Sequence, residues 1–355
     1  MNKTKLSSAS SVWQIFAGLG ALTLICCMGI FCYWSALFYV VDQDISLLPT
    51  ATLNPACKEA NCLNACLRRL PEFTIPPLLE DEAELAKRVQ GYEIARYRLD
   101  EQTGQFVRIA IPTVPEYLKP YQADTSLHQR IGNYFTGLFP SNSEVHVSSM
   151  VVYMNSAPQH FSAFIQDLDG KWQLSVNLFD IGSPQSLFEV LTHEYAHMLT
   201  LNKNQARRAE HTYRRSIKRS DFDTLRSTCN GRFYTGVSCA LDKAYLNAFG
   251  NRFWTGEVYE SWIEVFFMIY NDPAGYKAAM EEFYANHREQ FVSAYAATNP
   301  REDIAESWTE FIMRPKPSGE SIADQKVLFF NEFPELVQLR TEIISNVCQY
   351  AINQK

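Results

Sequence analysis

The chain has 355 residues, of which 46% are hydrophobic and 13% aromatic, so it can bury a full-sized core. This composition excludes an intrinsically disordered chain. The formal net charge of -7 at pH 7 gives no general attraction to phosphate backbones, and we expect no nucleic-acid partner.

The N-terminal part contains a long uncharged run, residues 11–41, rich in Leu, Ile, Phe and Trp. A helix that crosses a bilayer needs roughly 20 apolar residues, whereas a cleavable signal has an apolar region of only about 7–15. We therefore expect residues 12–41 to be a single-pass transmembrane signal-anchor, with cleavage near Ser35 as the alternative. Two lysines precede the run, so the positive-inside rule places residues 1–11 in the cytoplasm and the rest outside.

Cysteine usage agrees with export. Six cysteines follow the apolar run, and an even number suits disulfide pairing in an oxidising compartment: Cys57, Cys62, Cys66, Cys229, Cys239 and Cys348. The sequence leaves their connectivity open, and buried free thiols in a cytosolic domain are the alternative. The spacing of the first three matches no zinc or iron–sulfur pattern.

The region after the span divides into two parts. Residues 42–79 contain Pro and Thr without apolar periodicity, and we interpret them as a stalk that carries the first three cysteines. The folded domain is expected at residues 80–355. It opens with a helix at 79–90, followed by strand-like sequence that turns at Gly104, which is typical of an α+β domain.

Three further strands are predicted in the middle of the chain. Residues 145–154, 161–167 and 172–179 have strand-like composition, and the turn Asp169-Gly170 joins the last two in a hairpin. We interpret residues 172–179 as an edge strand onto which an extended peptide substrate could add.

A helix with a metal-binding motif is predicted directly after this hairpin. Ser183 offers an N-cap and Pro184 the first helical position, and the sequence HEYAH follows. His193 and His197 then lie one helical turn apart, so both imidazoles can bind one zinc ion. Glu194 lies beside the first histidine and can act as general base on water. A pair of ordinary surface histidines is the alternative.

The chain beyond Trp254 is predicted to be mainly helical, with one long helix over residues 274–296, and a third ligand is expected from one of these later helices. Glu302 and Glu306 are four positions apart in a segment whose helical start is marked by Asn299. One carboxylate can bind the metal, while the other accepts a hydrogen bond from a ligand imidazole. Tyr295, seven positions before Glu302, could donate its hydroxyl to a developing oxyanion.

A second pair of glutamates could supply the third ligand instead, because the 104 residues between His197 and Glu302 leave room for it. Glu260 and Glu264 also lie one helical turn apart. We favour Glu302, since no tyrosine stands seven positions before Glu260.

The intervening segment includes residues 203–219, with seven basic residues and one acidic. We interpret this stretch as a solvated helix face, with a substrate-docking or membrane-surface patch as the alternative.

At its motif residues the chain resembles the gluzincin metallopeptidases, in particular the catalytic domain of anthrax lethal factor and a group of bacterial zinc-binding metallopeptidases. The resemblance spans residues 145–350 in pattern, and its specific parts are THEYAHMLTL and a tyrosine followed, after six residues, by Glu-x-x-Ala-Glu. The second part is matched by Tyr295, Glu302, Ala305 and Glu306. The resemblance implies a zincin-like fold, Glu302 as third zinc ligand and a tyrosine that assists catalysis.

These observations together predict a membrane-anchored zinc metallopeptidase with one Zn²⁺ per chain, acting on a protein or peptide substrate. Its catalytic domain is expected outside the cytoplasm, and the resemblance favours a bacterial inner membrane facing the periplasm. Three alternatives stay open. They are a zinc amidase acting on cell-wall or small-molecule amides, an anchored protein that binds zinc without catalysis, and a precursor that cleaves its own stalk.

Overall fold

The computed structural model describes Cys57, residues 60–75, Leu85 and residues 91–157, 161–206, 219–236 and 238–353. All of them belong to one compact unit, Leu53–Lys355. Within these ranges no helix has both the length and the apolar character needed to cross a bilayer. The predicted span, the helix expected at 79–90 except Leu85, and most of the basic stretch lie outside the described residues.

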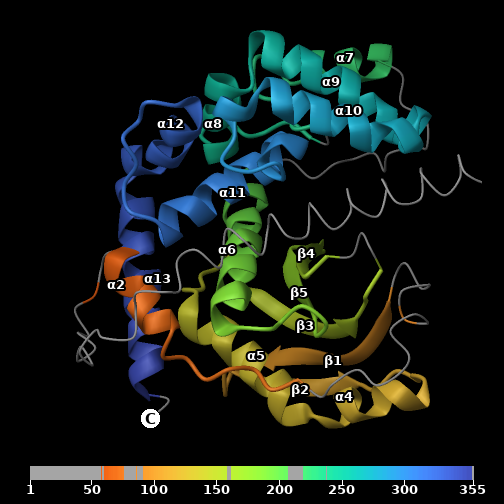
Figure 1. The fold of residues 1–355 in the computed structure, drawn as a ribbon, viewed down its shortest axis with the longest axis vertical. Coiled ribbons are helices and arrows are strands. Elements are labelled where there is room, and N and C mark those ends of the chain that lie inside the picture. Colours follow the sequence, from red (N-terminus) through yellow and green to blue (C-terminus); the bar gives the residue numbers. More distant parts are fainter. Residues whose placement is uncertain are drawn as a thin grey trace, which may run out of the picture. The chain divides into compact units, whose positions relative to one another are not determined.

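The unit is α+β, as the sequence predicts, and its β part is a mixed five-stranded sheet (Figure 1). The strands are β1 (Tyr92–Asp100), β2 (Gln105–Ala110), β3 (Val147–Met154), β4 (Ala163–Leu168) and β5 (Lys171–Asn177). Their order is β2-β1-β3-β5-β4, with β3 and β5 parallel and all other neighbours antiparallel.

The hairpin formed by β4 and β5 contains the predicted turn. Asp169 and Gly170 have φ values of 56° and 82°, the positive values that a tight two-residue hairpin turn requires. The prediction that residues 172–179 form an edge strand is wrong, because β5 lies between β3 and β4. Six of the seven residues of β5 are buried, which fits a strand covered on both faces, whereas β4 becomes exposed toward its end. The edge strand at this end of the sheet is therefore β4.

Helices α4 (Lys119–Ala123) and α5 (Thr125–Leu138) connect β2 to β3, and α6 (Pro184–Leu201) follows β5. The Ser183 hydroxyl accepts a hydrogen bond from the Ser186 amide at 3.1 Å, so the predicted start of α6 is confirmed. The Tyr134 hydroxyl of α5 donates to the Pro184 carbonyl at 2.7 Å and joins the two helices.

The rest of the described chain is helical, as predicted for the region beyond Trp254. Its helices are α7 (Arg219–Ser227), α8 (Tyr245–Phe253), α9 (Gly256–Asn271), α10 (Pro273–Asn286), α11 (Pro300–Met313), α12 (Ile322–Phe329) and α13 (Pro334–Asn353). Short 3-10 turns follow α10 where the sequence suggests a longer helix. Helix α11 packs against α6, which brings the two motif regions together (Figure 1).

The segment interpreted as a stalk is folded wherever the structure describes it. Residues Ala60–Leu67 form helix α2, which packs on α13 and α11. Leu63 and Phe73 are buried in the same hydrophobic core as the rest of the unit. The domain boundary expected near residue 80 therefore differs from the structure, in which the compact unit starts at Leu53. Sequence periodicity missed this because α2 has only eight residues.

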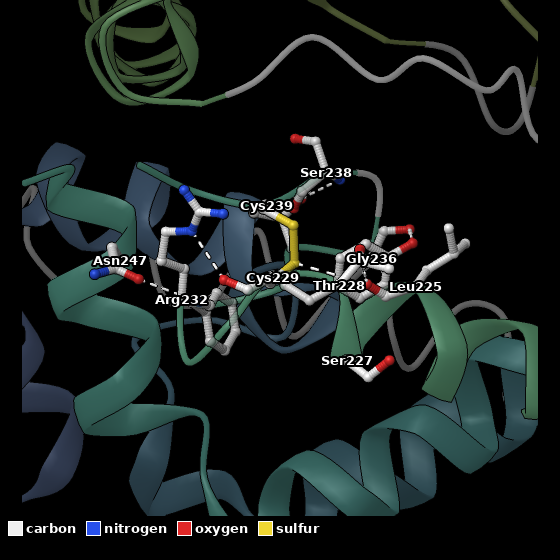
Figure 2. Close-up of a disulfide and its surroundings, with 12 residues drawn as sticks. Leu225, Ser227, Thr228, Cys229, Arg232, Gly236, Ser238, Cys239 and Asn247 are labelled. Atoms are coloured by element: carbon white, nitrogen blue, oxygen red, sulfur yellow. Dashed lines mark hydrogen bonds between the residues drawn. A yellow bond between two sulfur atoms is a disulfide. The ribbon is translucent and has the colours of Figure 1, made fainter. Parts of the chain in front are cut away.

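All six cysteines after the apolar run are paired, as the sequence predicts. The disulfides are Cys57–Cys62, Cys66–Cys348 and Cys229–Cys239. The second one joins α2 to α13 across 282 positions of the chain. Figure 2 shows the third, which closes a short loop after α7. The Arg232 side chain donates to the Cys229 carbonyl at 2.8 Å and holds this loop in place.

The structure contains a buried histidine away from the motif. His128 on α5 is fully buried, and its Nδ1 lies 2.8 Å from the Tyr97 hydroxyl of β1. Burial lowers the pKa of His128 from 6.5 to about 4. Between these values the unfolded chain binds a proton that the folded protein does not, so stability is lost as pH falls from 6.5 toward 4.

As the pH falls from neutral to about 4, we expect the free energy of unfolding to fall by up to about 3 kcal/mol because of His128. A pKa shift of one unit corresponds to roughly 1.4 kcal/mol. Denaturant titrations of wild type and His128→Gln across this range measure the effect. Glutamine does not titrate, so the variant should lose less stability on acidification. If stability fell equally with pH in both proteins, the assignment of this pH dependence to His128 would be contradicted.

Candidate metal centre

Two helices far apart in the sequence supply three metal-ligand side chains to one point. His193 and His197 project from α6, and Glu302 projects from α11. His193 Nε2 lies 3.1 Å from His197 Nε2 and 3.0 Å from Glu302 Oε2, and His197 Nε2 lies 3.1 Å from the same oxygen. The predicted third ligand is thus next to both histidines.

The donor set fits a zinc ion. Ligand atoms about 2.0–2.1 Å from a tetrahedral ion are roughly 3.3 Å apart, which is close to the spacing of these three atoms. Two imidazole nitrogens that face each other at 3.1 Å beside a carboxylate oxygen require a shared proton or a cation between them. Both histidines are at most 9% exposed, so water cannot fully solvate the group.

Glu306 holds the first histidine from behind. Its Oε1 lies 2.7 Å from His193 Nδ1, so this nitrogen donates its proton to the carboxylate and leaves the Nε2 lone pair for a metal. Ser293 donates to the other oxygen of Glu306 at 2.6 Å. Burial opposes the charge of Glu306, but the bonds from His193 and Ser293 outweigh it and lower the pKa.

The same contacts set the charge of the histidine. Burial lowers the pKa of His193, whereas its hydrogen bonds with Glu302 and Glu306 raise it to about 10 overall, so without a metal Nε2 holds a proton that a cation would displace. Burial opposes the charge of Glu302 as well, yet both histidines hold its pKa well below the ordinary range. Two carboxylates therefore supply negative charge to a site that can accept a cation.

Glu194 lies one residue after the first histidine and faces the sheet. It is 7% exposed, and its Oε2 accepts a hydrogen bond from the Ile165 amide of β4 at 3.1 Å. Burial raises the pKa of Glu194, although both motif histidines act in the opposite direction. A buried carboxylate with a raised pKa beside the ligand cluster is suited to accept and return a proton.

Tyr295 also borders the cluster, at the start of the 3-10 turn before α11. Its ring centroid is 5.6 Å from that of His193, and 43% of the residue is exposed. Partial burial and the nearby carboxylates of Glu302 and Glu194 raise the pKa of its hydroxyl. Tyr295 therefore keeps its proton and can donate it in a hydrogen bond.

Helix α11 is fixed at its start and on its inner side. The Asn299 side chain accepts hydrogen bonds from the Arg301 and Glu302 amides at 3.0 and 3.2 Å, which confirms the predicted helix start. Asp303 points into the core, where Lys326 of α12 lies 2.6 Å from its carboxylate and both side chains are fully buried. These contacts set the rotation of α11 that turns Glu302 toward α6.

The rival ligand pair lies elsewhere. Glu260 and Glu264 are on α9, and each lies 2.5 Å from the guanidinium of Arg219 in an exposed ion-pair network. Among the residues with described positions, the His–carboxylate group suited to a metal is the one formed by His193, His197 and Glu302. The choice of Glu302 over Glu260 or Glu264 agrees with this placement.

Sequence reasoning missed two partners of the site, Ser293 and the Ile165 amide. A serine two positions before Tyr295 carries no motif signal. A backbone amide is visible only once the strand order is known.

Comparisons of the chain with protein-family models, with curated proteins and with solved structures give no match.

Proposed function

We propose that this chain is a membrane-anchored zinc metallopeptidase with a zincin-like, gluzincin-type active site. The observation that carries the proposal is the convergence of His193, His197 and Glu302, with Glu306 bonded behind the first histidine. Export is supported by the three disulfides, which suit an oxidising compartment such as the bacterial periplasm. The anchor is proposed for the apolar run at residues 12–41.

In this mechanism His193, His197 and Glu302 would hold one Zn²⁺, which would act as a Lewis acid on a carbonyl and would lower the pKa of a water molecule. Glu194 accepts the proton of the attacking water and later delivers it to the leaving amine. Tyr295 donates its hydroxyl to the oxyanion that forms at the scissile carbonyl. Glu306 keeps the His193 ring in the tautomer that presents Nε2.

The neighbouring edge strand favours peptides over small amides as substrates. The Asn177 amide donates to the Ser162 carbonyl, and bonding alternates along an antiparallel pair, so the backbone groups of Ala163, Ile165 and Asp167 face away from β5. The Ile165 amide already reaches Glu194 in this direction. An extended peptide that adds to β4 would thus lie next to the general base.

We expect Asp167→Pro to raise KM for peptide substrates several-fold with little change in kcat or zinc content. Proline removes the outward amide of residue 167 without removing a bond to β5. Asp167→Ala is the matched control, because it removes the same side chain and keeps the amide. Equal KM values for the two variants would contradict the proposed role of β4 in binding an extended peptide.

Metal analysis of the purified full chain tests the proposal itself. We expect one zinc per chain in wild type, loss of zinc in His193→Ala and a large loss in Glu302→Gln. Glu264→Gln is the matched control, since it makes the same change on an exposed helix and should keep the metal. A folded wild-type protein without zinc would refute the proposal.

Hydrolysis of a quenched fluorescent peptide mixture separates the remaining alternatives. A metallopeptidase releases fluorescence in a zinc-dependent way, whereas a structural zinc protein does not. A purely structural zinc site needs neither a general base nor an oxyanion donor, whereas Glu194 and Tyr295 border this cluster. Self-processing would appear as a shortened N-terminus in wild type that is absent from Glu194→Gln.

A further inference from the structure

Four of the paired cysteines gather at one place, where α2 meets α13. Cys57 is bonded to Cys62, and Cys66 is bonded to Cys348. The sulfur atoms of Cys57, Cys66 and Cys348 nevertheless all lie within 4.8 Å of one another. The Cys57 sulfur of the first disulfide therefore lies next to both sulfurs of the Cys66–Cys348 disulfide.

The four sulfurs differ in their access to solvent. Cys57, Cys66 and Cys348 are buried, whereas Cys62 is half-buried. An external thiol can therefore reach the first disulfide at Cys62, and its attack there releases the thiolate of Cys57. That thiolate is left in the interior beside the second disulfide.

We propose that Cys57, Cys62, Cys66 and Cys348 form a thiol–disulfide exchange site for a dithiol reductant. The dithiol reduces Cys57–Cys62 and leaves as its own disulfide, which gives two electrons and two protons to these cysteines. The Cys57 thiolate then attacks the sulfur of Cys66. A Cys57–Cys66 bond forms, the Cys66–Cys348 bond breaks, and Cys348 leaves as a thiolate that takes up the proton.

The exchange changes what the disulfides connect. Before it, Cys66–Cys348 closes a ring of 282 positions and joins α2 to α13. After it, the new bond lies entirely within the N-terminal segment, and α13 is held only by non-covalent contacts, among them the hydrogen bond from Asn346 to the Leu138 carbonyl. One reducing event at a half-buried sulfur thus removes a covalent link in the core. The proposal does not depend on the metal centre.

The remaining disulfide provides a contrast within the same chain. Cys229–Cys239 is bordered by Leu225, Thr228 and Ser238 (Figure 2). In the described ranges no further cysteine joins these two in a close sulfur group. Reduction of this pair is therefore expected to end with two thiols and no exchange.

Partial reduction of the folded full chain tests the proposal. Cys26, Cys27 and Cys32 are first replaced by alanine, so that no other thiols are present. The protein, in detergent at about pH 8, receives an equimolar amount of dithiothreitol, and samples are quenched with acid and then alkylated with excess N-ethylmaleimide in denaturant near neutral pH, so that buried thiols also react. Non-reducing peptide mapping should show Cys57–Cys66 appearing as Cys57–Cys62 disappears, with Cys348 alkylated. Loss of Cys57–Cys62 while Cys66–Cys348 stays intact would overturn the proposal, and a Cys57–Cys348 bond would overturn the release of α13.

Two single variants in the same background separate proximity from general thiol reactivity. Cys62→Ser leaves the Cys57 thiol beside the second disulfide and should yield Cys57–Cys66 without added reductant. Cys239→Ser leaves the Cys229 thiol and should keep Cys66–Cys348. Exchange of equal extent in both variants would show random scrambling and would also overturn the proposal.

Discussion

Replacing Glu194 by glutamine is expected to lower kcat by about 10²–10⁴-fold, the range of a lost general base, while the zinc content stays unchanged. Glutamine keeps an oxygen that can accept the hydrogen bond from the Ile165 amide, so the contact between α6 and β4 can persist. It cannot accept a proton from water. The loss should therefore fall on kcat more than on KM.

Steady-state kinetics with elemental analysis of the same samples measure this effect. Glu189→Gln is the matched control, because it makes the same change one helical turn before His193 and should leave kcat within a few-fold. Full activity in Glu194→Gln would remove this residue from the mechanism. Loss of zinc in that variant would instead assign Glu194 a part in holding the metal.

Removing the Cys66–Cys348 disulfide is expected to lower the free energy of unfolding by about 5–6 kcal/mol, from the entropy of closing so long a ring. The Cys66→Ala, Cys348→Ala double variant removes the bond without leaving a thiol. The Cys229→Ala, Cys239→Ala variant opens a ring of only 10 positions and should cost about 3 kcal/mol.

Denaturant unfolding of both variants and of wild type gives the comparison. A larger loss for the Cys229–Cys239 pair would contradict ring length as the main cause. Equal stability of wild type and the Cys66–Cys348 variant would mean that packing of α2 alone holds the ends of the unit together.

The local parts of this structure could be read from sequence. The start of α6 depends on Ser183 and Pro184, and the β4–β5 turn depends on Asp169 and Gly170, all of which act over a few positions. Glu302 could be chosen by its spacing from other residues of the same segment. Local geometry is encoded by neighbours in the chain, so a single sequence carries it.

The non-local parts could not be predicted. β5 pairs with β3 in parallel, and nothing in the alternation of residues 172–179 specifies that partner. The pairing of Cys66 with Cys348 is one choice among many and depends on where α2 packs. Ser293 and the Ile165 amide reach the site only through tertiary contacts.

The ligands of the candidate metal centre come from two helices, and Glu302 follows His197 by 105 positions in the chain. Because a chain is made from its N-terminus, both histidines are synthesised well before the carboxylate that completes the set. A nascent or truncated chain that ends before α11 carries the HExxH motif with two ligands only. Under the proposed function, this order of synthesis would keep the protease inactive until most of the chain has been made. By then the chain can fold, and a folded chain is not a substrate for its own active site.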